Sequence, residues 1–138
     1  MKILDKKGIT FDDVLLVPKY SDLRSRAEAD TSTQIGGLRL KIPIITANMD
    51  SISGIEMAMA MGRLGGASVL HRFESEEKII GWLKELAYCG YPAIPSIGIK
   101  PIDITNAYRY RAYTDAICLD IAHGDHILAF EQLEKLQR

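Results

Sequence analysis

The chain has 138 residues, of which 47% are hydrophobic and 25% charged, and its 17 basic and 18 acidic side chains nearly cancel. This composition is typical of a soluble globular protein and favours neither a nucleic-acid-binding nor a membrane-binding surface. A complete (β/α)8 barrel usually needs about 250 residues, more than this chain has. The chain begins with charges and a glycine where a signal peptide needs an apolar core, so we expect a cytoplasmic protein.

The first predicted β-α unit comes after residues 1–40, a stretch of mixed, loop-like sequence. An apolar run at residues 42–49 predicts a strand, and residues 53–64 have the apolar spacing of a helix. Ser51 and Ser53 lie at the start of that helix, and the hydroxyl of either is suited to cap it.

The second unit has clearer boundaries. An apolar run at residues 66–72 predicts a strand, and the helix after it is expected to start at Ser75, before acidic residues, and to stop at Gly90. Two further units follow, with strands at 93–99 and 115–122 and helices at 102–113 and 126–138.

Four successive β-α units predict an α/β fold with a parallel sheet, and they amount to half of a (β/α)8 TIM barrel. We expect a single barrel domain in which residues 1–40 are an N-terminal segment and residues 41–138 are the four units. A small doubly wound domain is the alternative. The chain lacks the glycine-rich GxGxxG turn of such a fold, however, and its polar residues gather just past the strand ends.

Each predicted strand ends in residues that can bind a ligand. Ligands of parallel sheets and barrels bind at the carboxyl ends of the strands, so we expect these residues to converge on one rim. In chain order they are Asn48-Met49-Asp50, His71-Arg72, Ser96-Ile97-Gly98 and Asp120-Ile121-Ala122-His123-Gly124.

The same strand ends belong to a series of motifs that resembles a known enzyme family. In chain order they read TFDDVLLVPKYS, SRAEAD, IPIITANMDS, VLHRF, PSIGIK and CLDIAHG. Together they resemble the IMP dehydrogenase and GMP reductase family over most of the chain. The resemblance implies a TIM barrel, usually tetrameric, in which a cysteine on a later loop attacks C2 of a purine nucleotide. It also implies a nicotinamide cofactor that exchanges hydride with that carbon.

Within the family, two features favour the reductase branch. The short stretch between HRF and the third strand leaves no room for the CBS modules that dehydrogenases commonly insert there. SRAEADT, HRF and DIAHG also look more like bacterial reductases, since dehydrogenases tend to have lysine where this chain has Arg72. We therefore expect the complete barrel to reduce GMP to IMP and ammonia with NADPH. A dehydrogenase without CBS modules and a non-catalytic half-barrel remain the alternatives.

The family pattern also implies a role for residues near the cofactor. Ser25 and Arg26 match cofactor contacts, with Arg26 suited to a phosphate of NADPH. Arg72 matches a residue beside the cofactor, and Asp120 and Ala122 match contacts near the nicotinamide ribose. A carboxylate such as that of Asp120 accepts hydrogen bonds from ribose hydroxyls in other dinucleotide sites.

On the substrate side, Asn48, Met49 and Asp50 match the loop beneath the purine. No catalytic residue is assigned, because by the family pattern the nucleophilic cysteine and its acid/base partner lie outside this chain. No metal site is predicted, although the family allows for a potassium ion in the complete enzyme. The expected partners are a purine nucleotide and either further copies in a homo-oligomer, such as a tetramer, or a complementary C-terminal half.

Several of these residues also have purely structural interpretations. Asp50 is as well placed to cap or to complement the dipole of the following helix, or to brace its loop. Arg26 lies in a charged stretch typical of solvated surface, and His71 is expected to be a packed, hydrogen-bonded core residue. Cys118 is expected to point into the barrel interior as a small buried residue rather than to act as a nucleophile. We expect Cys89 to be inert as well, and His123 and His126 to be solvated loop residues.

Overall fold

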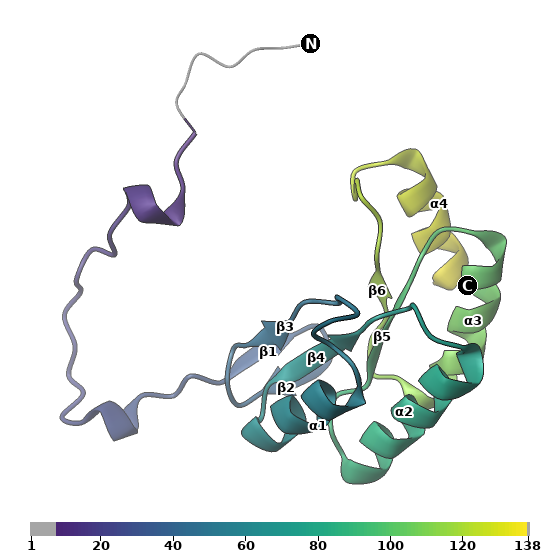
Figure 1. Cartoon of the computed structure of the whole chain (residues 1–138). Helices are drawn as coiled ribbons and strands as arrows, with labels where there is room; N and C mark the ends of the chain where they lie inside the picture. Colours follow the sequence, from purple (N-terminus) through teal and green to yellow (C-terminus); the bar gives the residue numbers. More distant parts are fainter. Residues whose placement is uncertain (1–7, 138) are drawn as a thin grey trace. The chain divides into compact units, whose positions relative to one another are not determined.

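The computed structural model describes residues 8–137 and falls into two units, Met1–Asp30 and Thr31–Arg138, each of which is described by itself (Figure 1). In the first unit, every residue from 8 to 30 is exposed. Short 3-10 turns at Phe11–Asp13 and Arg26–Glu28 are its only regular elements among the described residues. No helix within residues 8–137 has both the length and the apolar character needed to cross a membrane.

The second unit confirms the predicted alternation of strands and helices. Its four-stranded sheet is parallel throughout, with the strands in chain order, as in half of a TIM barrel. The strands are β3 (Ile45–Thr46), β4 (Ala67–Leu70), β5 (Ile94–Ile97) and β6 (Cys118–Leu119), and the helices are α1 (Ile55–Leu64), α2 (Glu76–Cys89), α3 (Pro101–Tyr110) and α4 (Ile127–Leu136).

The outer two strands, β3 and β6, are much shorter than the predicted runs 42–49 and 115–122. Each has a single neighbouring strand in the described sheet. Before β3 the backbone also turns back on itself, since the N–H of Ile44 donates to the carbonyl of Ile42 at 2.9 Å rather than to another strand. An apolar run therefore locates a strand here but overestimates its length, and no residue of these two runs is fully buried.

The limits predicted for the second helix are confirmed in detail. The hydroxyl of Ser75 accepts a hydrogen bond from the backbone N–H of Lys78, which caps the start of α2. Gly90 ends the helix in the left-handed conformation, with φ of 69°, where a residue without Cβ is favoured.

The predicted cap of the first helix is wrong. Gly54, not Ser51 or Ser53, is the N-cap of α1, and no side chain caps that end. The backbone N–H of Ser53 instead donates to the carbonyl of Met49 at 2.8 Å, which closes a tight turn ahead of the helix. Asp50 lies within this turn, so its interpretation as a helix cap is wrong as well.

The last two helices are close to their predicted positions. Pro101 occupies the first turn of α3, which continues as a 3-10 turn at Arg111–Tyr113. The start of α4 is capped by His126, whose Nδ1 accepts from the N–H of Leu128 at 3.2 Å. The prediction for this helix reached Arg138, which lies outside the described residues.

Residues 31–40 were expected to be loop-like, and this was wrong. They form an antiparallel hairpin of β1 (Thr33–Ile35) and β2 (Leu38–Leu40) around a turn with Gly36 at a φ of 56°. Gly36 satisfies such a turn because a glycine adopts positive φ without strain. The short strands escaped notice because they are only three residues long.

The sheet separates two apolar clusters. One includes residues of the helices and the sheet, among them Leu70, Leu83, Leu86, Ile97 and Tyr110. Burial raises the pKa of Tyr110 to about 12. The other contains Leu40, Ala67 and Ile94, against which the side chains of Leu38 and Cys118 pack. The hairpin therefore covers part of the inner face of the sheet. Cys118 points to this inner face, as predicted, although it is half-buried rather than fully buried.

Candidate functional site

A pocket of about 400 Å³ lies at the carboxyl ends of the strands. It is lined by Asn48, Met49, Asp50, Phe73 and Asp120. The first three follow β3, Phe73 follows β4 and Asp120 follows β6, so segments far apart in sequence meet there. The pocket brings together all three residues predicted to contact the purine and one of those predicted to contact the cofactor.

Buried hydroxyls hold the loop that carries Asn48, Met49 and Asp50. Ser53 is fully buried, and its hydroxyl bonds to that of Thr46 at 2.7 Å and to the carbonyl of Ala47. Thr46 in turn bonds to the hydroxyl of Ser68 in β4 at 2.6 Å. Because buried polar groups are costly to leave unpaired, this chain of hydrogen bonds ties the loop firmly to the sheet.

Asp50 uses one of its oxygens within its own turn. Its Oδ1 accepts from the backbone N–H of Ser51 at 2.7 Å, and the residue is exposed. The carboxylate therefore braces the loop and also lines the pocket, which combines two of the interpretations offered for it.

Arg72 and Asp120, both predicted to contact the cofactor, form an ion pair with each other. The Nε of Arg72 donates to Oδ2 of Asp120 at 3.0 Å, and the two side chains are 37% and 29% exposed. The backbone N–H of Asp120 donates to the carbonyl of Ile97 at 2.7 Å, which fixes the main chain at this point. The pair crosses from the end of β4 to the end of β6.

Phe73 lines the pocket but was not among the residues predicted for the site. Its ring lies under the guanidinium of Arg72, with 5.1 Å from Cζ to the ring centroid, and it stacks on His71 with centroids 6.2 Å apart. Its position directly after His71 and Arg72 at a strand end was the available signal. An exposed aromatic residue beside polar strand-end residues is a common ligand contact.

His71 is a packed core residue, as predicted. It is 5% exposed, and its ring meets that of Trp82 edge-on. Its Nδ1 accepts a hydrogen bond from the backbone N–H of Phe73, so a neutral ring carries its proton on Nε2. The histidine thereby orients the chain that enters the pocket.

The remaining predicted residues are not among those that line the pocket. Ala122 is exposed in the loop after β6, two residues beyond Asp120. Ser25 and Arg26 belong to the other unit, where the hydroxyl of Ser25 caps a short 3-10 turn by accepting from the N–H of Ala27. Their contact with a cofactor stays a prediction. His123 is exposed and lies 6.4 Å from His126 between ring centroids.

The cysteines differ in their surroundings. Burial, and to a lesser extent the negative charge of Asp120, raises the pKa of the Cys118 thiol, which disfavours the nucleophilic thiolate. Cys89 is exposed at the end of α2. Within residues 8–137, no three His, Cys, Asp or Glu side chains are grouped to hold a metal ion.

A larger hollow of about 630 Å³ lies beside the pocket and shares Asp50 with it. Two of its charged residues satisfy one another. Lys78 pairs with Glu74 at 2.7 Å and also lies over the ring of Trp82, 5.3 Å from the centroid.

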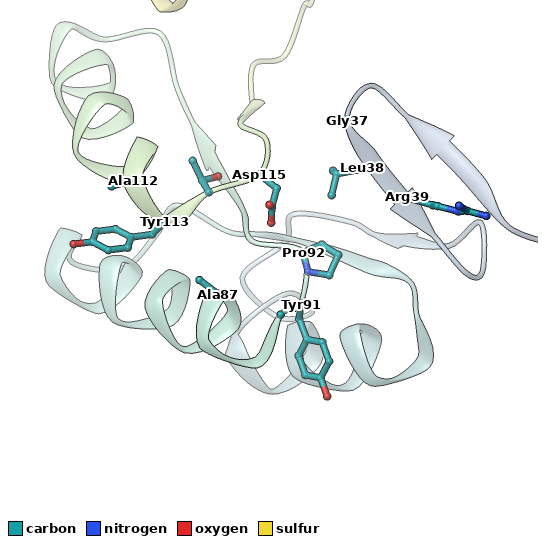
Figure 2. Close-up of a pocket in the computed structure, with 11 residues that line it drawn as sticks. Gly37, Leu38, Arg39, Ala87, Tyr91, Pro92, Ala112, Tyr113 and Asp115 are labelled. Carbon is teal, nitrogen blue, oxygen red and sulfur yellow. The ribbon is translucent and has the colours of Figure 1, made fainter.

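Another pocket, of about 420 Å³, lies at the opposite ends of the strands (Figure 2). Its polar side chains serve the backbone: Asp115 Oδ2 accepts from the N–H of Ala93 at 2.9 Å, and the hydroxyl of Thr114 donates to the carbonyl of Ala93 at 2.8 Å. Figure 2 shows Arg39 pointing away from Asp115. In TIM barrels this face contributes to stability, whereas ligands bind at the carboxyl face.

Comparison with known proteins identifies the family of the chain. The model of the IMP dehydrogenase / GMP reductase domain matches residues 8–87. The chain is 30% identical to a GMP reductase of Bacillus licheniformis over 131 residues, which is 93% of this chain and 40% of that protein. It is 51% identical to an inosine-5'-monophosphate dehydrogenase of Nitrosopumilus maritimus over 69 residues, which is 49% of this chain and 14% of that protein.

A solved structure extends the likeness to the fold. The crystal structure of inosine 5'-monophosphate dehydrogenase from Legionella pneumophila superposes with a TM-score of 0.85 at 36% identity, over 95% of this chain and 41% of that one. The chain thus spans less than half the length of each of these relatives. The matched residues include the loop of Asn48–Asp50, Arg72 and Phe73, so the chain belongs to the IMP dehydrogenase / GMP reductase domain family.

Proposed function

We propose that the complete protein carrying this chain is an oxidoreductase of purine nucleotides that converts GMP to IMP. In this reaction GMP, NADPH and two protons give IMP, ammonium and NADP+. One observation carries the redox part of the proposal: residues matched to the purine and to the cofactor line a single pocket. Hydride transfer requires that two such ligands lie in contact, and a shared pocket permits it.

The pocket suits a nicotinamide nucleotide next to a purine. Asp120 has a partly exposed carboxylate that can accept hydrogen bonds from ribose hydroxyls, and Phe73 and Met49 offer apolar surface to a flat ring. We assign Asn48, Met49 and Asp50 to the purine side. On the nicotinamide side we assign Asp120, with Ala122 beyond it in the same loop. The bound dinucleotide would supply the hydride, and these residues would orient it.

The connection between β4 and β5 favours the reductase within the family. It consists of a single helix, α2, with short loops and no inserted module. Three of the related GMP reductases align with 86–95% of this chain. Regulatory modules of the kind expected at this point in many dehydrogenases are therefore not accommodated between these strands.

An IMP dehydrogenase without such modules is the second candidate. The higher identity, 51%, is to dehydrogenases of Nitrosopumilus maritimus and Methanocaldococcus jannaschii, although over only about half of the chain. In that case the same pocket would hold IMP and NAD+, and the hydride would move in the opposite direction.

Other parts of the proposal concern the complete protein in its cytoplasmic setting. We assign Ser25 and Arg26 to the phosphate-bearing part of NADPH, because a guanidinium forms paired, charge-assisted hydrogen bonds with phosphate. The nucleophilic cysteine loop would come from the rest of the complete protein or from a complementary C-terminal half, and the complete protein would form a homo-oligomer such as a tetramer. A potassium ion would belong to that loop rather than to the described residues.

The test is a pair of assays on the complete protein purified from its native source. Loss of NADPH absorbance that depends on GMP and yields IMP and ammonium is the expected result. Formation of NADH from NAD+ and IMP, without the first activity, would establish the dehydrogenase instead. If the folded protein shows no activity in either assay, the result would contradict the enzymatic proposal and favour a non-catalytic half-barrel. NADH in place of NADPH, in the first assay, tests the cofactor assignment.

A further inference from the structure

The ion pair at the carboxyl face leaves the two oxygens of Asp120 in different states. Oδ2 accepts from Nε of Arg72 at 3.0 Å, whereas Oδ1 has no hydrogen-bond partner within residues 8–137. The carboxylate also lines the pocket. One oxygen is therefore held by protein, and the other is available to a ligand in the pocket.

Arg72 is held in place from several sides. Its guanidinium lies over the ring of Phe73. It crosses the end of β5 beside Gly98, where a Cβ would stand 3.5 Å from its NH1 and 2.8 Å from Oδ2 of Asp103. That Asp103 oxygen is engaged by the backbone N–H of Lys100 at 2.7 Å. A side chain at position 98 would therefore push against this cap, and it would also touch the guanidinium of Arg72 at an ordinary van der Waals distance.

These contacts of Arg72 depend on the shape of the arginine side chain and not on its charge alone. A guanidinium is flat, so it can stack on Phe73 while its Nε–H points at a carboxylate, whereas the ammonium of lysine can do neither in the same way. The charge of Arg72 is matched by that of Asp120, and Asp120 lines the pocket whereas Arg72 does not.

We infer that Arg72 is a positioning residue: it orients the carboxylate of Asp120 so that Oδ1 accepts a hydroxyl of the ligand, and it does not bind the ligand itself. This inference rests on the proposed function, because the ligand is taken to be the ribose of a nicotinamide dinucleotide. It replaces the direct cofactor contact that the family resemblance implied for Arg72.

A double-mutant cycle separates the two roles. The dissociation constant of NADPH is measured on the complete protein and on its Arg72→Gln, Asp120→Asn and doubly substituted forms. Asp120→Asn removes the negative charge, so that a charge-assisted hydrogen bond becomes a neutral one, and it is expected to weaken binding about tenfold. Arg72→Gln is expected to weaken binding several-fold, and the double variant to bind no worse than Asp120→Asn alone, because Arg72 then has no carboxylate to orient.

Lys100→Gln is the matched control, since it removes a positive charge from the same rim without touching Asp120. Whatever its effect on affinity, that effect should be the same in the presence and absence of Asp120. If Arg72→Gln behaves like this control, so that its effect multiplies with that of Asp120→Asn, Arg72 contacts the ligand directly and the inference is overturned.

A measurement without ligand keeps the inference distinct from the proposed function. In the complete protein labelled with nitrogen-15 at arginine, the Nε–H of Arg72 should exchange slowly with water and should lose that protection in Asp120→Asn. An unchanged signal would refute the pairing. If Asp120→Asn removes the protection of this Nε–H as expected but the protein binds no dinucleotide, the proposed function is refuted, and with it the role of the pair in ligand binding. Multiplicative effects on a measurable affinity would refute the positioning role alone.

Discussion

Two aspartates, Asp115 and Asp120, lie on either side of β6, and their carboxylates have different partners. Asp115 directs its carboxylate to the backbone N–H of Ala93, and its own N–H donates to the carbonyl of Ala93 at 3.0 Å. Asp120 directs its carboxylate to the side chain of Arg72 and into a pocket. A carboxylate that satisfies buried backbone serves the fold, whereas one held by a partly exposed side chain remains available to a ligand.

The largest effect on stability is expected at the first of these residues. Asp115→Ala leaves the N–H of Ala93, a residue only 1% exposed, without its acceptor. The free energy of unfolding should fall by about 1–3 kcal/mol. Denaturant unfolding of the complete protein measures this. Asp115→Asn keeps an acceptor oxygen and is the control. An alanine variant as stable as the wild type, or one that loses NADPH affinity at full stability, would erase the distinction between the two aspartates.

Asp120→Asn should show the reverse pattern. Its pair with Arg72 is partly exposed, and pairs of this kind contribute less than about 1 kcal/mol to folding. The free energy of unfolding should therefore change little, while the dissociation constant of NADPH rises. Denaturant unfolding measures the free energy of unfolding of this variant, and a titration with NADPH measures its dissociation constant. A loss of stability as large as that of Asp115→Ala would mean that Asp120 is a structural residue too.

The smallest expected effect is on the reactivity of Cys118. This residue lies in β6, between Asp115 and Asp120 in the sequence. Because burial and then Asp120 raise its pKa, less thiolate is present near pH 8, and iodoacetamide should modify it more slowly than the exposed Cys89. The rate should keep rising with pH beyond the point where an ordinary thiol levels off. Peptide mass spectrometry after timed alkylation gives both rates.

The substitutions at the two aspartates sharpen this last test. Asp120→Asn removes the smaller cause of the shift and should speed modification of Cys118 slightly, whereas Asp115→Asn should leave it unchanged. Equal acceleration by both substitutions would point to general loosening of β6 rather than to the charge of Asp120.

Much of the fold could be predicted because its signals are local. The four β-α units, the start of α2 at Ser75 and its end at Gly90 follow from apolar spacing and from residues that satisfy helix ends. The wrong cap for α1 has a tertiary reason. Ser53 is a good cap by residue type, but its hydroxyl is drawn instead to Thr46 and Ala47 in the neighbouring strand and loop.

The candidate site shows the same division. That polar residues after the strands meet at one rim could be expected from the parallel order of the strands. That Arg72 and Asp120 pair with each other could not, since they are 48 residues apart and no local pattern links them. Phe73 was not predicted as a site residue because its place in the pocket depends on its contact with the guanidinium of Arg72, which forms only in the folded chain.

The sequence by itself therefore determined the order of the elements, the family and the edge of the sheet at which the strand-end residues line a pocket. Each depends on residue spacing or on motifs that can be read along the chain. The tertiary structure alone decided which carboxylate is engaged by backbone and which is paired with a side chain beside the pocket, and how the hairpin covers part of the inner face. Those outcomes depend on competition between groups brought together from distant segments, where the best available partner for each buried donor or acceptor prevails.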